Sequence, residues 1–245
     1  MKTLKAFLTG VTIVGFAGSN YAATNEHHGL SSALAIDLEK DLANGDSAAL
    51  KALIAGNPDL TAQLTAEAVD DAVAAAQNSK ASAATLAATV AAADPDSAAT
   101  VAAAVATVVT PEVAAKVAGA VATADPVAAA TIAAAVTQVQ PTAAAEVAAA
   151  VVKSAPSSEG AVVATVIQVS ANSTTPVSAG DIETAVATST HASLTDVASA
   201  TALVATSPEV TQAVAEGGTA VGQAQTDVSQ GATTGKTSNA SLTIT

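Results

Sequence analysis

Proline recurs at a fixed interval through the middle of the chain. Pro111, Pro126, Pro141 and Pro156 are spaced fifteen residues apart, and Pro95 lies sixteen residues before the first of them. Proline has no backbone N–H, and it pushes the residue before it out of the helical conformation. A helix can therefore begin at each of these prolines, but it cannot continue through the next one without a break.

The stretches between the prolines are copies of one pattern. Positions four and five, counted from the proline, are alanine in the first five units, and positions seven and eleven hold a larger aliphatic residue. Positions four, seven and eleven fall on one face of a helix. Units begin at Lys80, Pro95, Pro111, Pro126, Pro141 and, in degenerate form, Pro156. The aliphatic positions are the predicted repeat core: Leu86, Val90, Val101, Val105, Val117, Val121, Ile132, Val136, Val147 and Val151.

The joins between units are predicted hinges. Asp94, Thr110 and Asp125 each precede a proline, and their side chains are of the type that accepts hydrogen bonds from the first N–H groups of a helix. A proline in the first turn gives up only an N–H that would have no helical partner. The predicted hinge and cap residues are Asp94, Pro95, Thr110, Pro111, Asp125, Pro126, Pro141 and Pro156.

Each unit is therefore predicted to form one short helix. A helix of about twelve residues is about 18 Å long and only marginally stable alone in water, so the units need to stack. We expect an all-α fold, an α-solenoid-like array of Ala/Val-rich helices with one helix per fifteen-residue unit. The alternative is a strand-rich fibre, because valine is β-branched. The helical spacing and the prolines favour the array.

A leucine-rich segment precedes the units. Large aliphatic residues are concentrated between positions 30 and 56, with Ser31 or Ser32 and Asp46 as predicted helix N-caps, and with Asn44-Gly45 and Gly56-Asn57 as predicted helix ends. The segment is predicted to form a helical hairpin, and a third helix is predicted from Pro58 to Gln77. The predicted helical repeat domain covers 31–218: a cap over 31–78, regular repeats over 79–170 and degenerate repeats over 171–218.

The repeat pattern decays after position 170. Helices are expected over 181–189, 194–206 and 208–216, the last opened by Pro208 and ended by Gly217-Gly218. Residues 219–245 are mostly Gly, Ser, Thr and Gln with few large side chains. That composition predicts a disordered tail.

The first 23 residues have the pattern of a secretory signal peptide. Lys2 and Lys5 precede an apolar run, and small residues follow it, with predicted cleavage after Ala22 or Ala23. An uncleaved anchor is the alternative, but the apolar run is shorter than a membrane span and is interrupted by Thr and Gly. We expect residues 24–30 to be flexible and the protein to be exported, periplasmic or extracellular, without membrane insertion after cleavage.

Composition narrows the classes of partner. The formal net charge is −13, and all eight cationic residues are lysine. Nucleic-acid binding needs a basic face, so no nucleic-acid partner is expected. The chain has no cysteine and therefore no disulfide. A protein partner or self-association remains as the expected interaction.

Few side chains are candidates for chemistry. His27-His28 lack the spacing of a metal site, and His191 has no second ligand near it in the sequence. The carboxylates of Glu67, Asp70 and Asp71 are expected to form a solvated helix face, because a pair of acid/base groups also needs a pocket that separates the two pKa values. We predict no catalytic, cofactor-binding or metal-binding residues, and no cofactor.

These observations favour an exported, non-enzymatic helical-repeat protein with a structural or protein-interaction role. The alternative is ice or surface binding: the composition resembles that of the Ala-rich helical antifreeze proteins of fish, and Thr85, Thr100 and Thr131 all occupy position six. Lys116 and Glu146 interrupt that series. An enzyme is the least favoured class, because active-site pockets are usually lined by aromatic and large apolar residues, which are scarce here.

Overall fold

The protein is all-α, as the sequence predicts. The computed structural model describes residues 31–57, 67–68, 73 and 80–237, and no strand occurs among them. The α-helices are α1 (Ser32–Asn44), α2 (Ser47–Gly56), α4 (Lys80–Ala93), α5 (Ala98–Val108), α6 (Pro111–Ala124), α7 (Ala129–Val139), α8 (Ala144–Ser154), α9 (Glu159–Ala171), α10 (Ala179–Thr190), α11 (Leu194–Val204) and α12 (Pro208–Thr237).

The N-terminal hairpin has the predicted boundaries. The side chain of Ser31 accepts a hydrogen bond from the N–H of Leu34, and Gly45 ends α1 in the left-handed conformation with φ 66°. Asp46 then caps α2 through a 2.9 Å bond from the N–H of Ala49. These caps follow from local sequence alone. The helix predicted over 58–77 lies largely outside the described residues.

A break in the helix occurs at every proline of the repeat. Pro111 is the first residue of α6, whereas three others open a single 3-10 turn that leads into the α-helix. Pro126 opens a turn before α7. The predicted break at each proline is therefore confirmed. The 3-10 turns are η2 (Pro95–Ser97), η3 (Pro141–Ala143) and η4 (Pro156–Ser158).

Asp94 and Thr110 occupy the predicted N-cap positions of η2 and α6, but the predicted capping by their side chains is wrong. Neither side chain makes a capping hydrogen bond. The backbone carbonyl of Asp94 accepts from the N–H of Ser97 at 3.1 Å, and that of Thr110 accepts from the N–H of Val113 at 2.9 Å. The tight first turn thus uses the N–H that a capping side chain would bind. Asp125 is the C-cap of α6 and not the N-cap of α7, which is Ala128. Its side chain accepts from the N–H of Val127 at 3.2 Å in the turn between the two helices.

Gln140 supplies a cap of a different kind. It occupies the position before Pro141, and its Nε2 donates to the carbonyl oxygens of Ala106 at 3.0 Å and Val109 at 3.3 Å. These carbonyls lie at the C-terminal end of α5, where helical partners run out. The join between two units therefore closes the end of an earlier helix, about two units back in the sequence.

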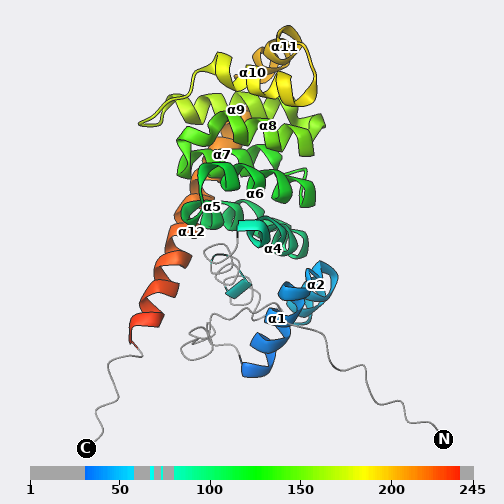
Figure 1. Ribbon diagram of the computed structural model, residues 1–245, viewed down its shortest axis with the longest axis vertical. Coiled ribbons are helices and arrows are strands. Elements are labelled where there is room, and N and C mark those ends of the chain that lie inside the picture. Colours follow the sequence, from blue (N-terminus) through cyan, green and yellow to red (C-terminus); the bar gives the residue numbers. More distant parts are fainter. Residues whose placement is uncertain (1–30, 58–66, 69–72, 74–79, 238–245) are drawn as a thin grey trace, which may run out of the picture.

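The helices stack in two layers, each made of alternate helices. α4, α6, α8 and α10 pack on one another in that order, and α5, α7, α9 and α11 form the second layer in the same way. Each helix also contacts its neighbours in sequence across the layers. Figure 1 shows the stack extending from α4 and α5, next to the α1–α2 hairpin, to α10 and α11 at the far end.

The core lies between the two layers and is built from alanine and valine. Each predicted repeat-core residue is buried there: Leu86, Val90, Val101, Val105, Val117, Val121, Ile132, Val136, Val147 and Val151. Leu86 retains 6% exposure, and the other nine retain none. Small side chains bring the helix backbones close together, so many short contacts replace a few large ones.

The C-terminal part of the chain differs from the prediction. α10 and α11 begin near the predicted positions, but α12 does not stop at Gly217-Gly218 and continues to Thr237. The predicted disorder of 219–245 is therefore wrong over 219–237, while 238–245 lie outside the described residues. Gly217 is a site of close helix packing and not a helix end. Among the described helices, none is long and apolar enough to span a membrane.

Candidate interaction face

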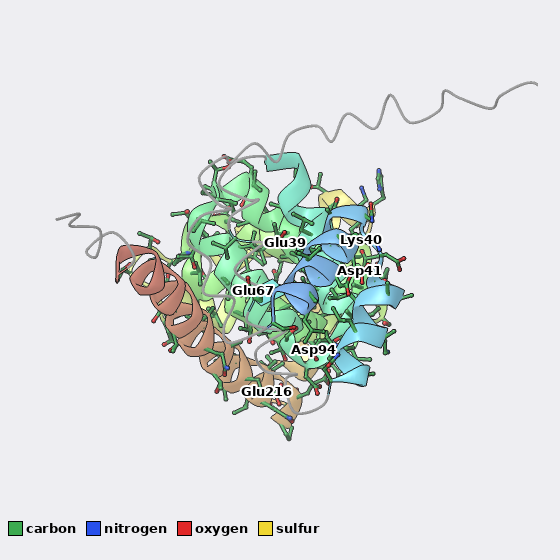
Figure 2. The ribbon with its side chains drawn as sticks, turned by 90° about the horizontal axis from the view of Figure 1, so that it is seen from below. Glu39, Lys40, Asp41, Glu67, Asp94 and Glu216 are labelled. Carbon is green, nitrogen blue, oxygen red and sulfur yellow. The ribbon has the colours of Figure 1, made fainter. Side chains whose placement is uncertain are left out.

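One face of the array is covered by the chain's own last helix. α12 packs on α7 and, to either side of it, on α5 and α9. Figure 1 shows α12 running along the stacking direction, across the helices of the second layer. Figure 2, seen from below, shows α12 along one side of the stack, with Glu216 on it. The outer surface of the α5–α7–α9 layer is thus a seat for a helix, which we call the α12 seat.

The side of α12 that faces the seat consists of small residues. Val210, Ala213, Gly217, Ala220 and Ala224 are buried, whereas most residues between them are exposed or half-buried. The stripe alternates steps of three and four residues, which keeps it on one side of a helix. α12 therefore presents a narrow, nearly flat contact surface to the seat.

The middle of the seat is formed by α7. Thr131 Oγ1 donates to the carboxylate of Glu216 at 3.1 Å, and Gln138 Nε2 donates to the backbone carbonyl of Val214 at 3.4 Å. Between them, a β-carbon built on Gly217 would lie 2.6 Å from that of Ala134. Two polar contacts thus flank one close approach of the helices, and together they fix where α12 crosses α7.

The same kind of close approach occurs at two other helix crossings. A β-carbon on Gly119 of α6 would lie 3.1 Å from the carbonyl oxygen of Ala150 in α8. One on Gly160 of α9 would lie 2.8 Å from the carbonyl oxygen of Ala200 in α11. These glycines permit backbone contact between stacked helices. Alanine at the same positions would hold the two helix axes farther apart.

Charge distinguishes the two layers at equivalent positions. Position six is Thr100, Thr131 and Ala161 in the covered layer, but Thr85, Lys116 and Glu146 in the other layer. Position thirteen is Thr107, Gln138 and Gln168 in the covered layer, but Ala92, Thr123 and Lys153 in the other. At positions six and thirteen, charged residues therefore occur only in units of the uncovered layer. This signal appears only when alternate units are compared.

The threonines at position six do not form one row. Thr85 belongs to the layer of α4, while Thr100 and Thr131 belong to the layer of α5 and α7. Thr131 is bonded to Glu216 of α12. A surface that binds a regular lattice would need these hydroxyls side by side on an open face.

The other polar candidates are separate from the seat. His191 is exposed and ends α10 with φ 60°, and no group of three or more His, Cys, Asp or Glu side chains able to hold a metal occurs in the described part of the chain. Glu67 is 4% exposed, so its predicted place on a solvated face is wrong: it is buried with Ala68 beside it. His27-His28, Asp70 and Asp71 lie outside the described residues.

Comparisons of the chain with family models, with curated proteins and with solved structures found no match.

Proposed function

We propose that this protein is an exported, non-enzymatic helical-repeat protein with a structural or protein-interaction role in the periplasm, matrix or cell surface. The observation that carries the proposal is the stacking of alternate helices, unit after unit, into two layers. An array of this kind is extended by adding units and offers long continuous faces. We infer that the array is an open α-solenoid.

The surface chemistry supports an interaction role. The layer of α4, α6 and α8 presents the exposed charged residues Lys116 and Glu146 at position six of their units and Lys153 at position thirteen. Mixed charges on one face keep an array soluble and give a partner polar groups to recognise. The covered layer carries uncharged residues at the same positions and accepts a helix instead.

In-cell photocrosslinking tests the interaction role. A photoreactive residue replaces Lys116 or Glu146, both exposed on the uncovered layer, and the same variants without irradiation serve as the control. We expect covalent adducts from positions 116 and 146 in the exported fraction after irradiation, and none without it. Absence of adducts from every exposed position on both layers, together with substrate turnover by the purified protein, would overturn the proposal.

Small-angle scattering of the purified protein tests the open array. A stack of layered helices gives an elongated particle, whereas a closed bundle gives a compact one. An elongated profile at low protein concentration supports the solenoid. A compact profile contradicts it and leaves only the all-α fold.

A further inference from the structure

We propose that α12 can be exchanged between two copies of this protein, each placing its α12 in the seat of the other. This inference deepens the proposed interaction role by naming the partner as a second copy of the same chain. Exchange of an identical segment needs no new complementary surface, because every contact made within one chain is made again between two.

The attachment of α12 to the rest of the chain permits this exchange. Only residues 205–207 separate α12 from α11. Among the described residues, α12 packs on α5, α7 and α9, while α11 packs on α9 and α10 and forms no such packing with α12. Ala205 and Thr206 in the connection are exposed. Releasing α12 from the seat therefore breaks the contacts with α5, α7 and α9 and leaves the stack of α11 on α9 in place.

The composition of α12 makes its helical state depend on the seat. The helix contains Gly217, Gly218, Gly222, Gly231 and Gly235, and glycine in a helix interior is among the least favourable residues. A released α12 is therefore expected to lose its helix, and the seat to expose its apolar surface. Both parts regain their contacts on docking, either within one chain or between two.

The chemistry of the seat favours α12 of a second copy over an unrelated helix. A docked helix needs a residue without a side chain opposite Ala134, an acceptor opposite Thr131 and a narrow stripe of small residues, and α12 supplies all three. The chain carries a net charge of −13, which opposes association of copies through their charged faces. The seat carries no charge at positions six and thirteen of its units, so the exchanged contact brings no like charges together at those positions.

The absence of cysteine from the chain allows a direct test. One full-length variant carries Thr131→Cys, a second carries Glu216→Cys, and the two are unfolded, mixed, refolded together at high concentration and treated with a short thiol-specific crosslinker. A docked pair holds the thiols at an effective concentration in about the millimolar range, so we expect roughly tenfold more covalent dimer than from a pair that does not meet.

Matched controls make each outcome decisive. Lys116→Cys mixed with Glu216→Cys places the first thiol on the uncovered layer and should give only background dimer. Adding Gly217→Val to the Glu216→Cys chain should remove the excess, because the valine cannot approach Ala134. A double variant, Thr131→Cys with Glu216→Cys in one chain, reports docking within that chain as a crosslinked monomer.

The inference is overturned if the mixed pair gives no more dimer than the Lys116→Cys pair while the double variant crosslinks within itself. It is also overturned if the double variant remains helical but fails to crosslink, since α12 then does not occupy the seat. Neither result bears on photocrosslinking at positions 116 and 146 to other proteins. Failure of exchange and failure of the proposed function are therefore distinguishable.

Discussion

Gly217 of α12 faces Ala134 of α7 at a distance that leaves no space for a methyl group, since a β-carbon on the glycine would lie 2.6 Å from that of the alanine. The backbone nitrogen of Ala135 is 3.0 Å from the same point. The crossing of α12 over α7 is therefore set by direct contact with a glycine backbone.

Replacement of Gly217 by alanine should weaken the docking of α12. The added methyl group forces the two helices apart, and overpacking of this kind costs about 1–3 kcal/mol. Hydrogen exchange should show faster exchange of the α12 amides. Gly222 is the matched control, because nothing lies within 4 Å of the corresponding β-carbon. Gly222→Ala should stabilise α12 by up to about 1 kcal/mol. Equal effects of the two substitutions would contradict the close contact.

Gln140→Ala should destabilise the array by about 1–2 kcal/mol, because it leaves the carbonyl oxygens at the end of α5 without this donor. Urea unfolding followed by circular dichroism measures the change. Gln168→Ala replaces an exposed glutamine of α9 and should stay within about 0.5 kcal/mol of the parent. If the two variants have the same free energy of unfolding, Gln140 does not act as an inter-unit cap.

Thr137→Val and Thr165→Val should each stabilise the protein. Both residues are fully buried, and neither hydroxyl oxygen has a hydrogen-bond partner. A methyl group in place of such a hydroxyl removes a desolvation penalty of about 1–3 kcal/mol. Thr201→Val is the comparison, because the Thr201 hydroxyl donates to the Val197 carbonyl at 2.8 Å. In thermal unfolding, both test variants should have a higher melting temperature than the parent. Thr201→Val should have a melting temperature no higher than that of the parent.

His191→Gly should stabilise the end of α10. His191 adopts φ 60°, a conformation that glycine reaches without the steric cost of a β-carbon. The expected gain is about 0.5–1 kcal/mol, reduced by the greater freedom of glycine in the unfolded chain. His191→Ala retains the β-carbon and should give no gain. A stabilisation by alanine equal to that by glycine would show that loss of the imidazole, and not the backbone conformation, is responsible.

Export predicts a processed N-terminus. Cleavage after Ala22 or Ala23 leaves a chain that begins at Ala23 or Thr24. Intact mass and N-terminal sequencing of the protein from a culture supernatant or periplasmic extract check this. Recovery of the protein only with Met1 and the apolar run intact would contradict the signal-peptide prediction.

Local features of the fold were predictable because they depend on few residues. Each proline interrupts the helix wherever it stands, so the breaks follow from proline spacing alone. Ser31, Gly45 and Asp46 act within their own turns, and their capping roles in the hairpin follow for the same reason. The burial of the valines at positions seven and eleven was predictable as well, because any helix that stacks on others buries its apolar face.

Features that depend on distant contacts were not predictable in this way. Gly217-Gly218 has the composition of a helix end, and only the position of α7 shows that Gly217 is needed for close packing. Gln140 bonds to carbonyls more than thirty residues earlier, which no local pattern indicates. The sequence does distinguish the covered face from the uncovered one. Lys116 and Glu146 occur in alternate units, and these units form the uncovered layer.

The Ala/Val core has a mechanical consequence. Alanine has no side-chain rotamer, and valine has little freedom within a helix, so the interior has few ways to rearrange when one helix is pushed. A displacement is then carried from helix to helix, with little absorbed by side-chain motion. The stack should therefore deform little under load and transmit force from the α4 end to the α10 end.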